Sequence, residues 1–198
     1  MKSVKWMGVL AGVGVLAAGA AVLTPSPAPA VASAALADAQ TVDGVHSSVV
    51  FKIKHMDTAN FYGVFKDISG TFNLDSSDAS KSSIDVKVKA ESIDTRNSGR
   101  DAHAKRADFL SVKEFPEITF KSTSVKKTGD KTFDVTGDMT FRGVTKPVTA
   151  QVTQTDEAGR GLEAKFSIKR SDFGNNFMVD NKGLSDQMDF IVALEAKK

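Results

Sequence analysis

One stretch of the sequence, residues 131–156, constrains the fold more than any other, because it contains two alternating runs that meet at Gly143. In each run nearly every second residue is apolar, which is the period of a strand with one buried face. The apolar face carries Phe133, Val135, Gly137, Met139 and Phe141 in the first run and Val144, Val148, Ala150 and Val152 in the second, with Lys146 as the exception. A shift of one residue would expose all of these side chains, so the register of the predicted hairpin is strongly specified.

Six further runs show the same alternation and are predicted to be strands. They cover residues 47–55, 64–74, 82–91, 117–125, 161–170 and 187–196. In the second of these runs Phe65 is out of phase with Ile68, which predicts a bulge or bend near Lys66 or Asp67. Gly70, in the middle of the same run, also suits a sharp bend in the strand.

The alternation breaks once, between residues 93 and 115, where the pattern predicts a short helix at about residues 99–110. Asn97 or Ser98 is placed to cap its N-terminus. Eight strands with short connections and one helix predict an all-β fold, either a sandwich of two sheets or an eight-stranded antiparallel closed barrel with its apolar side inward. We favour the barrel, because strands of about ten residues are long enough to enclose side chains or one small ligand.

A membrane barrel is the alternative with the apolar face outward. Alternation of Phe or Val with Lys or Asp does not distinguish the two arrangements by itself. However, membrane barrels carry girdles of aromatic residues, and the only tyrosine and tryptophan here are Tyr62 and Trp6. The composition therefore favours an apolar interior.

The N-terminal 37 residues have the three-part layout of a secretory signal peptide. Lys2 and Lys5 precede an uncharged apolar run at residues 8–23, and Ala35-Leu36-Ala37 forms a small-x-small site before Asp38. An uncleaved membrane anchor is the alternative, but a spanning helix needs roughly 20 apolar residues. The sequence thus predicts a leader at 1–37 and one exported domain at 38–198, in the periplasm or, alternatively, secreted.

Charge and composition exclude several classes of function. The chain has 26 Lys and Arg against 24 Asp and Glu, and two of the lysines lie in the leader, so the exported domain is nearly neutral. A nucleic-acid partner would require a basic surface. The sequence has no cysteine and lacks the nucleophile-elbow, dinucleotide and phosphate-loop motifs, so we predict that the protein is not an enzyme. The three histidines lack the spacing of a metal site, and none is predicted.

Five segments in fixed order carry a specific resemblance. They are DGVHSSVVFKIKH, GVFKDISGTFNLD, SIDTRNSGRDAHAKRADFLSVKEFPEITFKS, GDMTFRGVTKPV and IKRSDFG. Together they resemble the YceI-like family of exported lipid- and polyisoprenoid-binding proteins, over essentially Thr41 to Lys198. The resemblance implies a lipocalin-like barrel whose apolar cavity takes an isoprenoid chain, a quinone tail or a fatty amide, and it favours the periplasm. Residues 41–44 depart from the family pattern, which has an aromatic residue and a proline there.

The candidate ligand-lining residues are the inward apolar positions of the predicted strands. They are Phe51, Ile53, Phe72, Val86, Val88, Phe120, Phe133, Val135, Met139, Phe141, Phe166, Ile168, Phe190 and Val192. Each of them could equally fill a solid core. For a polar headgroup the candidates are His46, His55, Arg100 and His103, because arginine suits a phosphate and histidine can donate to a quinone oxygen; each also fits an ordinary surface position.

The sequence therefore predicts an exported carrier or store that buries a long apolar chain without covalent chemistry and needs no cofactor besides the bound lipid. Its expected partner is an apolar small molecule, with transient membrane contact for ligand exchange and a homodimer as further expectations. The alternative is an exported adhesion or interaction sandwich with a solid core and no ligand.

Overall fold

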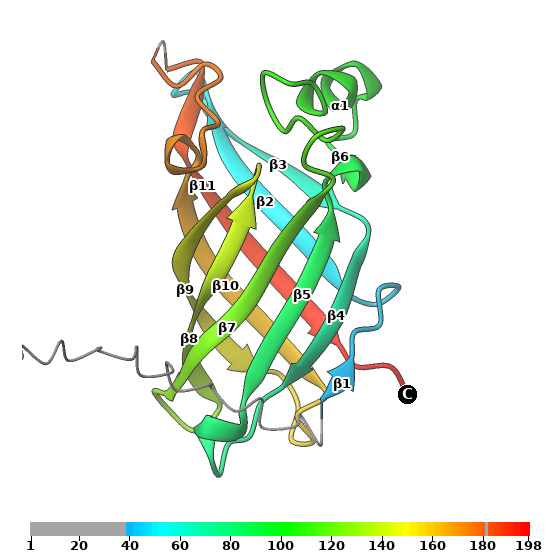
Figure 1. Ribbon diagram of the computed structural model, residues 1–198, viewed down its shortest axis with the longest axis vertical. Coiled ribbons are helices and arrows are strands. Elements are labelled where there is room, and N and C mark those ends of the chain that lie inside the picture. The colour runs from blue at the N-terminus through cyan, green and yellow to red at the C-terminus, as the bar shows by residue number, and fades with distance from the viewer. Residues whose placement is uncertain (1–38, 181) are drawn as a thin grey trace, which may run out of the picture. The chain divides into compact units, whose positions relative to one another are not determined.

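The computed structural model describes residues 39–180 and 182–198 of the chain; the predicted signal peptide, residues 1–37, lies outside them. The strands are β1 (Gln40–Thr41), β2 (Ser48–His55), β3 (Ala59–Phe65), β4 (Ile68–Asn73), β5 (Ser83–Lys89), β6 (Ile93–Asp94), β7 (Glu117–Lys127), β8 (Thr132–Phe141), β9 (Val144–Gln154), β10 (Gly161–Lys169) and β11 (Leu184–Glu195) (Figure 1). The helices are α1 (Ser98–Ala104) and the 3₁₀ turns η1 (Ala79–Lys81), η2 (Ala90–Ser92) and η3 (Arg170–Phe173).

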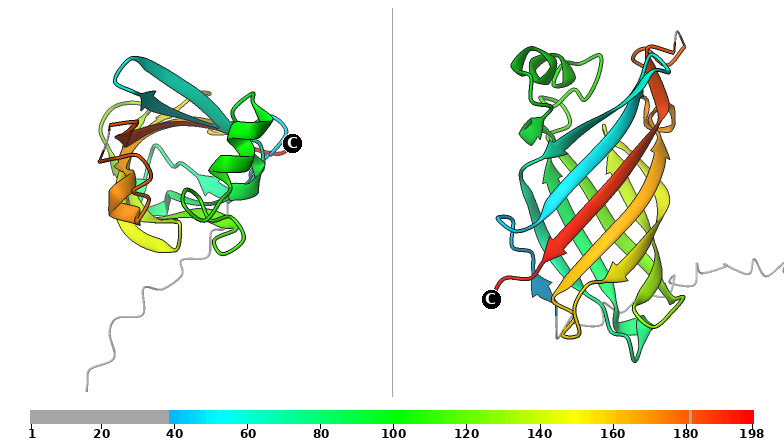
Figure 2. Two further views of the ribbon diagram at one scale, coloured as in Figure 1. Left: turned by 90° about the horizontal axis from the view of Figure 1, so that it is seen from above. Right: turned by 180° about the vertical axis from the view of Figure 1, so that it is seen from behind.

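All of these strands belong to one antiparallel sheet, in the order β1-β4-β5-β7-β8-β9-β10-β11-β2-β3-β6. The sheet curls round into a barrel (Figure 2). At one end β1 pairs with β4, and the segment around it bonds to β11 and the residues after it, through Asp43 N to Glu195 O at 2.7 Å and Lys197 N to Thr41 O at 2.9 Å. At the other end β3 pairs with both β2 and β6. The predicted barrel is confirmed, and the sandwich is wrong.

The strand expected at residues 64–74 is one bent strand that begins earlier, at Ala59. Its two halves, β3 and β4, meet at Lys66 and Asp67, the position where the sequence predicted a bend. The side-chain oxygen of Ser92 accepts hydrogen bonds from both backbone N–H groups of the bend, at 3.1 Å each. Counting β3 and β4 as one strand and omitting the two-residue β1 and β6 gives the eight expected strands. The first half was missed because Tyr62 and Val64 place apolar side chains on the outer face and blur the alternation.

The predicted helix is shorter than expected. It begins at Ser98, is capped by Asn97, whose side chain accepts from the backbone N–H of Arg100 at 2.9 Å, and ends at Ala104 rather than near residue 110. The chain then continues in turns, with Leu110 N bonded to Ala104 O at 3.0 Å. The turns allow both Phe109 and Leu110, which are adjacent in sequence, to be buried.

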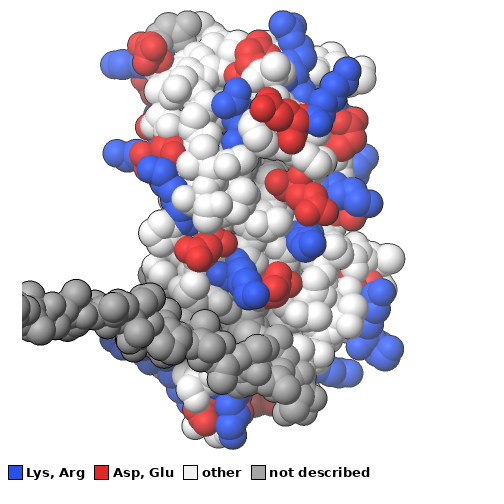
Figure 3. Space-filling view, in the orientation of Figure 1, with Lys and Arg blue, Asp and Glu red and all other residues white. Residues whose placement is uncertain are grey.

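The predicted hairpin has the expected register, with Phe133 opposite Val152 and Phe141 opposite Val144. Arg142 and Gly143 form its two-residue turn with φ values of 50° and 74°, as the right-handed twist of the strands favours. The apolar face of this hairpin points into the barrel, while acidic and basic side chains are interspersed over the outer face shown in Figure 3. No helix in residues 39–180 and 182–198 is long and apolar enough to cross a bilayer.

The barrel wall is uneven between β9 and β10. β9 pairs with β8 over ten residue pairs, but with β10 over only four, in which Gln151–Gln154 face Leu162–Lys165. Beyond Lys165 the ladder between β9 and β10 stops although both strands continue. The wall therefore has an unpaired stretch in the half of the barrel that lies toward α1 (Figure 1).

Candidate functional site

The interior of the barrel contains an apolar cavity, which we call the barrel cavity. Its lining consists of Val49, Phe65, Ile68, Ile84, Val86, Val88, Ile118, Thr119, Phe120, Val135, Met139, Ala150, Val152, Leu162, Ala164, Phe166, Phe190, Val192 and Leu194. Only Thr119 is polar, and no lining side chain is titratable. The cavity volume that water-sized spheres can occupy is about 70 Å³. The cavity is thus narrow, and its surface can exclude water but cannot transfer protons.

The predicted lining residues fall into three groups in the structure. Eight of the fourteen line the barrel cavity: Val86, Val88, Phe120, Val135, Met139, Phe166, Phe190 and Val192. Phe51 and Ile53 line a second pocket nearer α1. Phe72, Phe133 and Phe141 are at most 1% exposed and line neither, and Ile168 lies along a groove at the wall.

The sequence reasoning left out several residues that do line the barrel cavity. Val49, Ile84, Ile118 and Leu194 lie on inward faces that the alternation had already identified, so the signal was present. Phe65 is different, because it was out of phase with the rest of its predicted strand. It reaches the cavity since the bend after it resets the alternation.

A second apolar pocket lies beneath α1, and we call it the upper pocket. Its lining is Phe51, Ile53, Phe61, Ile93, Thr95, Arg100, His103, Ala104, Phe109, Phe177 and Leu184, around a cavity volume of about 90 Å³. The rings of Phe51, which lines this pocket, and Phe65, which lines the barrel cavity, are 5.5 Å apart between centroids. These two rings therefore stand between the upper pocket and the barrel cavity.

Two predicted headgroup residues lie together at the upper pocket. The guanidinium of Arg100 donates to the side-chain oxygen of Thr95 at 3.0 Å and to its carbonyl at 2.7 Å, and its carbon lies 4.2 Å from the ring centroid of Phe61. His103 is 3.3 Å from the carboxylate of Asp108 and meets the ring of Phe177 edge-on at 4.8 Å. The upper pocket thus combines the cation of Arg100 and the imidazole of His103 with a mostly apolar lining.

The acid beside His103 is held in its charged form. Burial alone would raise the pKa of Asp108, but the hydrogen bond from His103, a backbone N–H and the nearby charge of Arg106 together lower it below its ordinary value. Asp108 therefore stays ionised and keeps the His103 ring in place against Phe177.

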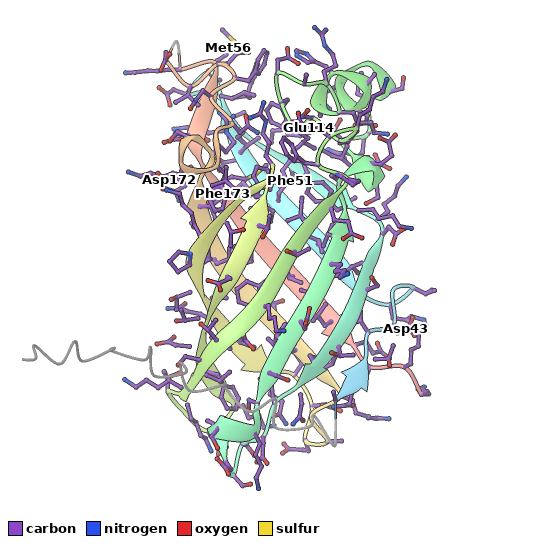
Figure 4. The ribbon with its side chains drawn as sticks, viewed as in Figure 1. Asp43, Phe51, Met56, Glu114, Asp172 and Phe173 are labelled. Atoms are coloured by element: carbon purple, nitrogen blue, oxygen red, sulfur yellow. The ribbon has the colours of Figure 1, made fainter. Side chains whose placement is uncertain are left out.

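The other two predicted headgroup residues lie elsewhere. His55 is exposed at the end of β2, next to Met56. His46 lies at the β1 end of the barrel, 2.8 Å from Asp43, and Figure 4 shows Asp43 and Met56 at opposite ends. The hydrogen bond between this pair lowers the pKa of Asp43 and raises that of His46. A single headgroup site cannot contain both His46 and His103.

Arg170, at the end of β10, shapes the upper pocket from inside the protein. It is fully buried, and its guanidinium donates to Ser185 O and Asn175 Oδ1 at 2.9 Å and to the carbonyls of Phe177 and Leu184 at 3.3 Å. Burial lowers the pKa of Arg170, and the charge of Asp186 opposes this. Because Phe177 and Leu184 line the upper pocket, the arginine fixes part of its wall, a role that the sequence pattern does not predict.

The described residues offer no group of three His, Cys, Asp or Glu side chains that could hold a metal ion. What the two pockets can do chemically is to enclose an apolar chain and contact a polar group near α1.

Residues 40–196 match the model of a family described as the YceI-like domain. The chain is 41% identical over 160 residues to "Protein YceI" of Escherichia coli O157:H7, which covers 77% of this chain and 82% of that protein, and it has the same identity and coverage with "Protein YceI" of Salmonella newport strain SL254.

Solved structures agree in fold. The crystal structure of Burkholderia cenocepacia BcnA is similar with a TM-score of 0.72 at 25% identity, covering 79% of this chain and 99% of that one. A polyisoprenoid binding domain from Saccharophagus degradans is similar with a TM-score of 0.61 over 79% of this chain and 98% of that domain; at 14% identity it shows the fold alone. From the family match and the relatives at 41% identity, the chain belongs to the YceI-like family.

Proposed function

We propose that this protein is an exported carrier or store that buries the apolar chain of an isoprenoid, quinone or other lipid in the barrel cavity, without covalent chemistry. The barrel cavity supports the proposal most directly, because eighteen of its nineteen lining residues are apolar. Each 100 Å² of chain removed from water contributes about 2.5 kcal/mol. A long chain can therefore bind tightly without a strong polar contact.

The narrowness of the cavity limits the shape of the ligand. An extended single chain suits it, and a ring system or a folded chain does not. Met139, which is unbranched and adaptable, and the partly exposed Phe120, Phe166 and Val192 are the lining side chains with the most freedom to move aside. Binding is thus expected to widen the cavity by rotation of these side chains.

The polar end of the ligand is proposed to lie in the upper pocket, at Arg100 and His103. For this to happen the chain must pass the rings of Phe51 and Phe65, which then part around it. The Saccharophagus degradans domain of the same fold is described as binding a polyisoprenoid, and we include this class of ligand in the proposal. Periplasmic location, transient membrane contact and a homodimer belong to the same proposal, as does the absence of catalysis.

Extraction of the purified protein tests this function. Protein prepared from an exporting host is extracted with organic solvent, and the extract is quantified by mass spectrometry. We expect about one lipid with a long apolar chain per protein molecule, retained through size-exclusion chromatography. Protein that yields no lipid, and that also fails to take up an added polyprenyl or fatty chain after extraction, would contradict the carrier function and favour an interaction module without a ligand.

A further inference from the structure

The unpaired stretch of the barrel wall consists of residues 144–150 of β9 and residues 166–169 of β10, and we call it the wall gap. Within the described residues these two segments do not pair with each other, although β9 remains paired with β8 and β10 with β11. Thr149 and Ser167 both line the two outer grooves that follow the wall gap. The outer surface of the barrel is therefore grooved along the wall gap.

Two rings separate the wall gap from the inside. Phe166 and Phe190 line both the barrel cavity and the outer groove, and their rings stack with centroids 4.9 Å apart and planes 11° apart. Phe190 is 3% exposed, whereas Phe166 is partly exposed. Rotation of the single Phe166 side chain would connect the cavity with the groove.

A second place where an outer groove touches cavity residues is less suited to opening. There the shared residues are Leu162 and Leu194, which are 1% and 4% exposed. They pair directly across a continuous β10–β11 ladder, and Leu162 also pairs with β9. An opening at that place would have to break backbone hydrogen bonds, whereas the wall gap has none to break.

The side chain of Arg142 forms hydrogen bonds that connect the segments at one end of the wall gap. Arg142, in the turn that begins β9, donates to the carbonyl of Gly174 at 2.8 Å and to that of Ala107 at 2.7 Å. Gly174 directly follows η3, whose Asp172 and Phe173 are labelled at the rim in Figure 4. Arg142 thus ties the start of β9 to the segment after β10 and to the turns after α1.

The strand edge at the wall gap is also protected against pairing with another chain. Pro147 removes a backbone donor from β9, and such a proline suits an edge without a partner. Lys146 and Lys169 are exposed beside it, and charged side chains discourage edge-to-edge association. The β9 edge can therefore stay unpaired in the folded protein without associating with another chain.

We propose that the ligand's apolar chain enters and leaves the barrel cavity sideways through the wall gap. Rotation of the Phe166 side chain opens the passage, and the hydrogen bonds of Arg142 hold the edge of the gap in place. This inference rests on the proposed function. Sideways passage means that a long chain does not have to be threaded lengthwise past α1.

A reversible cross-link across the wall gap tests this passage. Because the chain has no cysteine, a Thr149→Cys, Ser167→Cys pair can be bridged by a bis-methanethiosulfonate reagent and released by reductant. The matched control is a Thr140→Cys, Thr145→Cys pair on the paired β8–β9 ladder, where the native hydroxyls are 2.8 Å apart. The ligand is cis-parinaric acid, a slim polyene fatty acid whose fluorescence increases in apolar surroundings, and stopped-flow mixing gives its association and dissociation rates.

We expect the cross-linked gap to slow both rates about tenfold or more with little change in affinity, reductant to restore them, and the control cross-link to leave them unchanged. An Arg142→Gln variant should speed both rates. Cross-linked protein that exchanges cis-parinaric acid at the wild-type rate would overturn the inference while equilibrium binding upholds the carrier function. If the wild-type protein does not bind the fatty acid at all, the carrier function fails and this inference fails with it.

Discussion

At the end of β10 the side chain of Arg170 is fully buried, and four neighbouring residues accept its hydrogen bonds. A buried cation persists only when its donors are satisfied. The alternation of β10 does put residue 170 on the inward side with Ile168, so its direction was predictable. Its partners were not, because Asn175 and Phe177 come from an irregular segment, and Leu184 and Ser185 begin β11 ahead of the strand predicted at residues 187–196.

Replacement of this arginine should destabilise the protein strongly. An Arg170→Met variant keeps an unbranched side chain but leaves the carbonyls of Phe177, Leu184 and Ser185 without their donor, and we expect the free energy of unfolding to fall by about 3 kcal/mol or more. The exposed neighbour provides the control, since Lys169→Met should change stability by less than about 0.5 kcal/mol. Urea titration measures both, and equal midpoints for the two variants would contradict the role assigned to Arg170.

Among the elements, the bent strand formed by β3 and β4 does most to close the barrel, and its geometry depends on one glycine. Gly70 has φ of 132°, and a Cβ atom there would lie 2.2 Å from the carbonyl oxygen of Asp85 on β5. β5 thus lies so close to Gly70 that only glycine fits at this position. Gly99 in α1 is a contrasting case, because a Cβ atom there would meet only the Asn97 side chain, at 3.5 Å.

These two glycines give a paired prediction for alanine substitution. Gly70→Ala should lower the free energy of unfolding by more than about 2 kcal/mol through backbone strain and displacement of β5. Gly99→Ala should leave it unchanged or raise it by up to about 1 kcal/mol, since alanine is the better helix former. Thermal unfolding followed by circular dichroism compares the two, and a Gly70→Ala protein that melts with the wild type would show that β4 and β5 are not so closely fitted.

The strands were predictable from the sequence wherever one face of the strand is apolar and the other is polar. Local pattern alone identified the hairpin register, a bend near Lys66 or Asp67, and Asn97 as one of two candidate helix caps. It extended α1 too far because local pattern does not reveal that Phe109 and Leu110 are both buried in turns. For the candidate site, alternation shows which face a side chain takes but not whether its neighbours fill the space beside it, so Phe72 and Val88 could not be told apart.

Taken as a whole, the molecule combines a wall of hydrogen-bonded strands with an interior that is not completely filled. The barrel cavity and the upper pocket lie one above the other, with Phe51 and Phe65 between them. The ladder between β9 and β10 stops at the wall gap, and charged side chains are scattered over the outside shown in Figure 3. The proposed carrier function requires an apolar chain to occupy the barrel cavity.

The most direct measurement is a fluorescence titration of cis-parinaric acid into two tryptophan variants of β5. Val88→Trp fills the barrel cavity, and Lys87→Trp adds the same side chain to the outer face one residue earlier. Val88→Phe is a smaller substitution in case the larger one impairs folding. We expect Lys87→Trp to bind as the wild type does and folded Val88 variants to lose binding at least about tenfold. A folded Val88→Trp protein with wild-type affinity would contradict the proposed carrier function.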